Sequence, residues 1–92
     1  MIVPAPADLA ASNETNSGFD LDWTADAQAT DYLIEVALDS AFTQHVVYQT
    51  VQTNTHTVTG LNADTEYFAR VATLRGYMFS PPCAAVTVQT LP

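Results

Sequence analysis

Few residues in this chain could act as a nucleophile or a base. The imidazoles are His45 and His56, and Cys83 carries the one thiol. Catalysis of acyl or group transfer needs a nucleophile, a base and an orienting group that converge in a cleft. His56 opens a short alternating segment and is expected at a half-buried rim, while Cys83 follows Pro81 and Pro82 and is expected to be a small half-buried hydrophobe. The sequence therefore predicts that the chain is not an enzyme.

Two pairs of carboxylates are candidates for acid–base or metal chemistry. Asp20 and Asp22 occupy alternate positions of one predicted strand, so they should lie side by side on a solvated face. Asp26 and Asp31 flank a loop, where they either contribute oxygen ligands to weak Ca²⁺ binding or remain solvated carboxylates. No Asp-x-Asp-x-Asp-Gly loop, zinc-type Cys/His cluster or glycine-rich phosphate loop is present. We expect no cofactor and no metal.

Length and charge restrict the class of protein and of partner. The 92 residues suffice for one domain, and ten acidic residues oppose two basic ones, for a net charge of −8. Nucleic acid and anionic membrane surfaces are poor partners for such a chain, because binding to them depends on Lys and Arg. No apolar run approaches the roughly 18 residues of a membrane span, and the start at Met1 lacks the features of a signal peptide. We interpret the chain as a module taken from a longer protein.

Short alternating segments, separated by turn residues, predict an all-β fold. Their spacing of roughly 8–12 residues is typical of a β-sandwich. The predicted strands are 7–11, 18–23, 31–38, 45–51, 55–59, 66–74 and 84–90. Side chains alternate between the faces of a strand, so the pattern predicts an inner set of Phe19, Leu21, Trp23, Tyr32, Ile34, Val36, Leu38, Tyr67, Ala69, Val71, Val86 and Val88. The predicted outer set is Asp20, Asp22, Leu33, Glu35, Ala37, Phe68, Arg70, Ala72 and Leu74.

The run that joins two of these strands has the pattern of a sandwich corner. It places Gly60 and Leu61 at the end of one strand and Tyr67 at the start of the next, after a polar turn. In such a corner the chain crosses between sheets, and a buried Tyr hydroxyl bonds to backbone just upstream. With this run, with Trp23 closing the second strand and with a Val-Thr-Val-Gln-Thr-Leu-Pro tail, the chain resembles a fibronectin type III module over nearly its whole length.

That resemblance implies an immunoglobulin-like β-sandwich. It would have seven antiparallel strands in A-B-E and C′-C-F-G sheets, with residues 1–6 and 91–92 as linkers and 7–90 as the sandwich. The segment Asp39-Ser-Ala-Phe42-Thr resembles a turn of bacterial members, in which Asp39 would accept backbone N–H bonds and Phe42 would fold onto the core rim. The absence of lysine also resembles the composition of exported bacterial surface modules. The resemblance thus implies an extracellular or cell-surface location.

The loop Arg75-Gly-Tyr77-Met78-Phe79-Ser is the first candidate binding site. Some fibronectin type III modules carry an Arg-Gly-Asp tripeptide here, but Tyr77 stands in place of that Asp, so integrin binding is not implied. Large apolar side chains beside a cation are favoured at binding hot spots. The alternative is that Phe79 and Met78 tuck under the loop. We expect Phe79 to be mostly packed and Tyr77 mostly exposed.

The outer face of the 31–38 and 66–74 strands is the second candidate. Leu33, Phe68 and Leu74 are predicted to gather there around a cross-strand pair of Glu35 and Arg70. The leading functional hypothesis is a non-catalytic spacer and interaction module of a larger secreted or cell-surface protein, monomeric, with neighbouring domains as its partners. The alternative is direct binding of a protein or a glycan through the loop and this sheet face.

Overall fold

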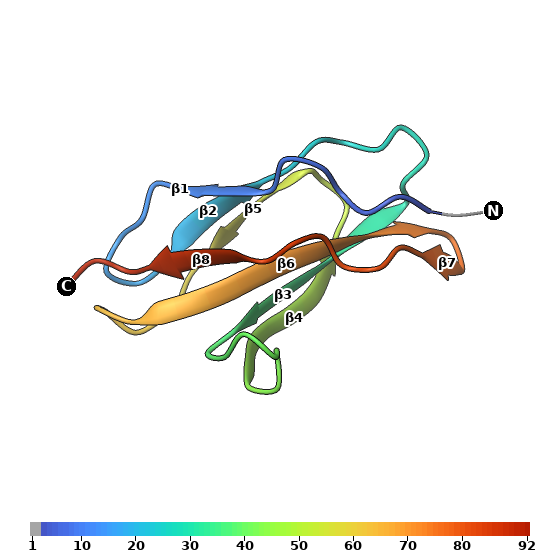
Figure 1. The fold of residues 1–92 in the computed structure, drawn as a ribbon. Coiled ribbons are helices and arrows are strands. Elements are labelled where there is room, and N and C mark those ends of the chain that lie inside the picture. Colours follow the sequence, from blue (N-terminus) through green and yellow to red (C-terminus); the bar gives the residue numbers. More distant parts are fainter. Residues whose placement is uncertain (1–2) are drawn as a thin grey trace.

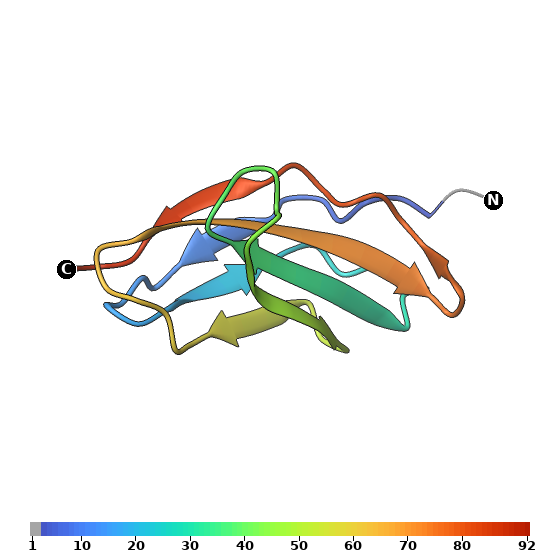
Figure 2. The same cartoon turned by 90° about the horizontal axis from the view of Figure 1, so that it is seen from below.

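Two antiparallel sheets face each other across an apolar core in the computed structural model, which describes residues 3–92 (Figures 1 and 2). The strands are β1 (Ala10–Ser12), β2 (Phe19–Asp22), β3 (Asp31–Ala37), β4 (His45–Val51), β5 (Thr55–Val58), β6 (Glu66–Arg75), β7 (Met78–Phe79) and β8 (Val86–Gln89). The smaller sheet has the order β1-β2-β5; the larger has β4-β3-β6-β7, with β8 also paired to β6. The predicted all-β sandwich is confirmed. Residues 3–92 contain no helix that could span a membrane.

Three strand predictions differ from the structure. The first strand begins at Ala10 rather than at residue 7, since Asp8 has a left-handed backbone with φ 61°. The last begins at Val86, later than predicted. The short strand β7 was not predicted: Gly76, with φ 63°, turns the chain back so that β7 pairs with the end of β6. The predicted loop is therefore a hairpin.

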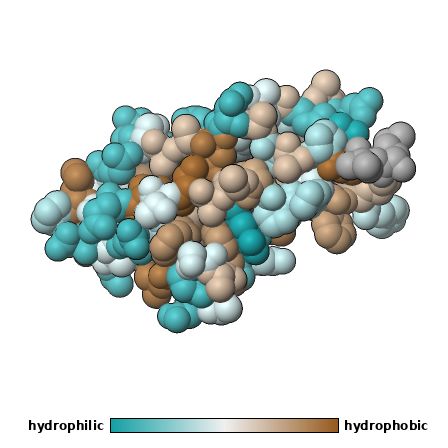
Figure 3. Space-filling model, viewed as in Figure 1, coloured by the Kyte–Doolittle hydropathy of each residue, from teal (hydrophilic) through white to brown (hydrophobic). Residues whose placement is uncertain are grey.

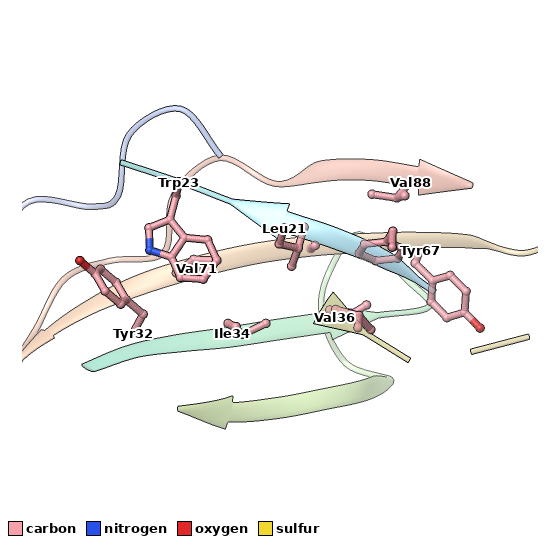
Figure 4. Packing of buried hydrophobic residues seen from close by; sticks show 11 residues of the cluster. Leu21, Trp23, Tyr32, Ile34, Val36, Tyr67, Val71 and Val88 are labelled. Carbon is pink, nitrogen blue, oxygen red and sulfur yellow. The ribbon is translucent and has the colours of Figure 1, made fainter. Parts of the chain in front are cut away.

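The core is built by the alternation of β2, β3 and β6, as predicted (Figure 4). Its buried cluster is Phe19, Leu21, Trp23, Tyr32, Ile34, Val36, Val58, Tyr67, Ala69, Val71 and Val88. Burial of each large apolar side chain contributes about 1.5–3 kcal/mol to stability. Val86 was expected in the core and is half-buried.

Three side-chain predictions on and just after β3 are wrong. Leu38 was placed in the core but is 42 % exposed, because the strand ends at Ala37 and the alternation ends with it. Glu35 and Ala37 were placed outside and are buried. Glu35 keeps its outward position but is covered by the side chains that bind it, as described below. A register shift between Val36 and Ala37 marks an irregularity in the pairing with β4, beside the turn that begins at residue 38.

The corner between β5 and β6 has the predicted geometry. Tyr67 is 1 % exposed, and its hydroxyl accepts the backbone N–H of Asn62 at 2.9 Å. Thr90, which is also buried, donates to the Asn62 carbonyl at 2.7 Å and accepts the Thr65 N–H at 3.0 Å. The backbone of the corner is therefore held by two side chains: Tyr67, which was predicted, and Thr90, which was not.

The start of the described residues and the C-terminal end lie at opposite ends of the long axis (Figure 1). The Cα trace extends 44 × 24 × 18 Å. Of the predicted linker 1–6, residues 1–2 lie outside the described residues, whereas Val3 and Pro6 are buried against the sandwich. The chain therefore enters at one pole and leaves at the other.

Replacement of the corner tyrosine tests the corner. Tyr67→Phe should lower the free energy of unfolding by about 0.5–1.5 kcal/mol, because the Asn62 N–H loses its acceptor. Urea melts measure the change. Tyr48→Phe is the matched control, since that side chain is 64 % exposed, and it should leave the midpoint unchanged. Equal stability of both variants would contradict the assigned role of Tyr67.

Candidate interaction surface

The face of the larger sheet that points away from the core is termed here the outer face. Partners directly across an antiparallel pair project to the same side. The register places Leu33 between Thr50 on β4 and Ala72 on β6. It also places Leu74 opposite Phe79 on β7. Side chains that are far apart in the sequence therefore meet in rows across this face.

These rows enclose a shallow apolar hollow of about 330 Å³, termed the outer-face groove. Its lining residues are Leu33, Tyr48, Thr50, Ala72, Leu74 and Phe79. A second hollow of similar size shares four of these residues and extends past Glu35 and Arg70 to Pro81 and Pro82. Together they form a trough with aromatic rings on both sides, which could take an apolar or planar group. Figure 3, drawn in the view of Figure 1, shows hydrophobic surface across the middle of the molecule and hydrophilic residues toward the C-terminal end and at the upper right.

The hairpin that joins β6 and β7 presents its aromatic side chains to solvent. Tyr77, at the turn, is fully exposed, as predicted. Phe79 is 75 % exposed, so the prediction that it packs under the loop is wrong. The reason is the pairing of β7, which holds Phe79 opposite Leu74 on the outer face rather than beneath the turn. Met78 is exposed as well.

The predicted cluster of Leu33, Phe68 and Leu74 is divided in the structure. Leu33 and Leu74 line the outer-face groove, but Phe68 lies farther along β6, opposite Ala37 and Thr87. Arg70 stands between them on the same face. The groove is therefore completed by Tyr48 and Phe79, and Phe68 takes no part in it.

The buried carboxylate of Glu35 organises the side of the trough. It accepts from Arg70 Nε at 2.9 Å and Nη2 at 3.1 Å, which confirms the predicted pair. His45 Nε2 lies 2.8 Å from the same carboxylate, a contact that sequence reasoning missed. Burial alone would raise the pKa of Glu35, but the hydrogen bonds from Arg70 and His45 outweigh it and hold the pKa below its usual value. Both carboxylate oxygens of Glu35 are engaged, so the carboxylate holds the side chains of Arg70 and His45 in position.

Phe42 completes this arrangement from the loop between β3 and β4. The Arg70 guanidinium carbon lies 4.0 Å from the centroid of the Phe42 ring, a cation–π contact. Phe42 is buried, as predicted, but against the outer-face arginine rather than with the core cluster. Asp39 accepts the backbone N–H groups of Thr43 and Gln44 at 3.0 and 2.9 Å, as predicted, and fixes the loop.

Arg75 is not available as the cation of the predicted loop site. Its Nη2 lies 2.8 Å from Oδ2 of Asp26, and its Nε donates to the same carboxylate at 3.0 Å. The hydrogen bond from the Gln28 N–H is the main cause that lowers the pKa of Asp26. The hydrogen bond and positive charge of Arg75 lower it further. The guanidinium therefore occupies the Asp26 carboxylate, one of the two that were candidates for weak Ca²⁺ binding. Residues 3–92 contain no group of three or more His, Cys, Asp or Glu that could hold a metal ion.

The remaining candidates for chemistry have structural environments. His56 is half-buried on β5, opposite Leu21, as predicted. Cys83 is also half-buried, and its Sγ accepts the Val71 N–H at 3.4 Å. Burial raises the pKa of the Cys83 thiol and so lowers its reactivity at neutral pH. The prediction that Cys83 is half-buried is confirmed.

Tyr48 is the main binding candidate that sequence reasoning missed. The strand 45–51 was predicted correctly, and alternation puts Tyr48 and Thr50 on one face and Val47 and Val51 on the other. That signal was present in the sequence. The neighbours of Tyr48 across the groove depend on the register, which a single sequence does not reveal.

Comparison with known proteins identifies the architecture. A family model described as fibronectin type III domain matches residues 4–89. No curated protein matches the sequence. Among solved structures, the chicken CNTN1 FN1-FN3 domains have a TM-score of 0.83 at 18% identity, over 98% of this chain and 31% of that chain. The fn3 domain of the human collagen alpha-1(XX) chain has a TM-score of 0.81 at 24% identity, over 97% of this chain and 86% of that chain. This chain thus spans about a third of the first structure and most of the second.

The exposed hairpin gives a direct test of its role. Replacement of both Tyr77 and Phe79 by Ser should change the free energy of unfolding by no more than about 0.5 kcal/mol, because both rings are solvent-exposed. Thermal or urea melts measure this. A loss of roughly 1.5–3 kcal/mol would mean instead that an aromatic ring is buried under the hairpin.

Acidification should weaken the sandwich through Glu35. Its pKa is lower in the folded chain than the ordinary value of 4.5, so its contribution is complete above that value and is lost as the pH falls through the folded pKa. Glu35→Gln should lower the free energy of unfolding at pH 7 by roughly 1.5–3 kcal/mol. It should also flatten the decline below pH 4.5 in urea melts.

Glu66→Gln, at an exposed position, is the control for the Glu35 variant. It should leave both the stability at neutral pH and the acid slope close to those of the parent chain. An unchanged acid slope in Glu35→Gln would show that the buried carboxylate does not govern acid stability.

Proposed function

Because the chain belongs to the fibronectin type III domain family, we propose that it serves as a non-catalytic spacer and interaction module in a larger secreted or cell-surface protein. Domains of this family are generally non-catalytic modules. The composition, rich in acidic residues and without lysine, resembles exported bacterial modules, and we extend the proposal to that setting. Neighbouring domains of the parent protein would be its partners.

The observation that carries this proposal is the position of the first described residues and of the C-terminal end. They lie at opposite ends of a 44 Å axis (Figure 1). A domain that is entered at one pole and left at the other adds its full length to a string of domains. Two features would keep such a spacer stiff: the tyrosine corner at one pole and the Asp26–Arg75 ion pair toward the other.

Direct binding of a protein or glycan is the second candidate function. It is favoured by the exposure of Tyr48, Tyr77 and Phe79, three aromatic side chains beside a groove whose remaining residues are almost all apolar. Exposed rings of this kind bind apolar surfaces and the flat faces of sugars. The arginines would contribute less than the sequence predicted, since both are held in ion pairs.

A tandem protein tests the spacer proposal. In chains of one, two and three copies, the maximum dimension from small-angle X-ray scattering should grow by about 44 Å with each copy. A matched series with Gly/Ser linkers should give shorter and broader distance distributions, because such linkers behave as flexible coils. Growth close to the 24 Å width would contradict the proposal, since it would mean that copies pack side by side.

A further inference from the structure

The strand β4 leaves one edge of the larger sheet open. It pairs with β3 alone, and none of the other strands formed by residues 3–92 lies along its second side. Every other residue of an edge strand directs its N–H and C=O groups away from the sheet. With seven residues, β4 is longer than β1, β5 and β8, which have three, four and four. It is the edge with most room for another strand.

Apart from the irregularity at its start, this edge lacks the features that usually prevent pairing. Natural edge strands are protected by charged residues, by proline or by bulges that twist the edge away. The sequence of β4 is His-Val-Val-Tyr-Gln-Thr-Val, with no Lys, Arg, Asp, Glu or Pro. The register shift near His45 affects its first residues only. Val46 and Tyr48 are 44 % and 64 % exposed, so an incoming strand would also find apolar side chains.

The charges around this edge select the kind of strand that could bind. Both arginines are held in ion pairs, with Glu35 and with Asp26. Eight acidic residues have no cationic partner within residues 3–92: Asp8, Glu14, Asp20, Asp22, Asp31, Asp39, Asp64 and Glu66. Two of them lie just beyond the two ends of the β3–β4 pairing: Asp31 precedes Tyr32, the partner of Val51, and Asp39 lies two residues after Ala37, the partner of His45. A cationic segment would be attracted, and a second copy with the same charge would be repelled.

We propose that the open edge of β4 binds an extended, lysine- or arginine-bearing segment of another protein as an added β-strand. Main-chain hydrogen bonds to β4 would provide affinity, and alternate side chains would contact Val46 and Tyr48. Basic residues at the ends of the segment would lie near Asp31 and Asp39. The site is centred on the backbone edge of β4, and of the two side chains that it uses only Tyr48 also lines the outer-face groove. It does not depend on the spacer role.

Synthetic peptides provide the first test. The probe is the nine-residue peptide Lys-Thr-Val-Thr-Val-Thr-Val-Thr-Lys with a fluorescent label, measured by anisotropy in low-salt buffer. It should bind about tenfold more tightly than the same peptide with Glu at both ends, and the difference should shrink as salt is added. A third peptide, N-methylated at alternate amides, keeps the charges but cannot form the ladder and should not bind. Equal binding of the methylated peptide would overturn the proposal.

Two tyrosine variants locate the site. Tyr48→Lys places a cation on the edge strand, whereas Tyr77→Lys makes the same change of charge on the hairpin turn. The first should weaken binding of the lysine peptide about tenfold or more, and the second by no more than about twofold. Equal losses would indicate a general charge effect and would contradict an edge site. Phe79→Ser should leave binding intact, because Phe79 lies on β7, which pairs with β6 and has no place along the open edge of β4.

Hydrogen exchange completes the test. The lysine peptide should slow amide exchange within residues 45–51 and leave β7 unchanged. Protection at β7 instead would place the peptide in the groove and overturn the edge site while leaving the second candidate function open. Sedimentation should show a monomer without peptide. Concentration-dependent dimers with protected β4 amides would mean that the occupant is a second copy, which contradicts the proposal.

Discussion

The register between β3 and β6 is the constraint on which the rest of the structure depends. Seven residue pairs join the two strands, from Asp31 opposite Leu74 to Ala37 opposite Phe68. This register sends Tyr32, Ile34 and Val36 into the core and leaves Leu33 and Glu35 outside. A slip of one residue would exchange the two sets and expose the core. The buried cluster, the groove and the Glu35–Arg70 pair are thus three consequences of one pairing.

Two buried tyrosines close the sandwich at opposite ends of that core. Tyr67 accepts the N–H of Asn62 in the loop between β5 and β6, and Tyr32 accepts the N–H of Asp26 in the loop between β2 and β3, at 2.7 Å. Both loops carry the chain from the smaller sheet to the larger one. Figure 4 shows Tyr67 and Tyr32 at the two ends of the cluster. Each hydroxyl therefore satisfies a backbone donor where the chain leaves one layer for the other.

Both of the basic side chains, Arg70 and Arg75, are held in ion pairs within the domain. One arginine offsets the burial of Glu35 on the outer face, and the other joins the end of β6 to the loop before β3. Because both guanidinium groups are engaged in ion pairs, they are less available to a partner. The remaining charge comes mainly from carboxylates without a cationic partner. Exposed aromatic rings and the uncharged edge of β4 are left as the surfaces with most to offer a partner.

Local patterns in the sequence determined the sandwich. Alternation in β2, β3 and β6 is set by the period of a strand, and the spacing of Leu61 and Tyr67 is set by the corner, so both could be predicted without any tertiary information. The same is true of the exposed Tyr77 at a glycine turn. The candidate interaction surface was decided by the tertiary structure. Phe79 lies on the outer face because β7 pairs with β6, Glu35 is buried because Arg70 and His45 cover it, and Arg75 is engaged because a loop from the other sheet brings Asp26 to it. These contacts join residues far apart in the chain, and a period of two residues carries no information about which strands become neighbours.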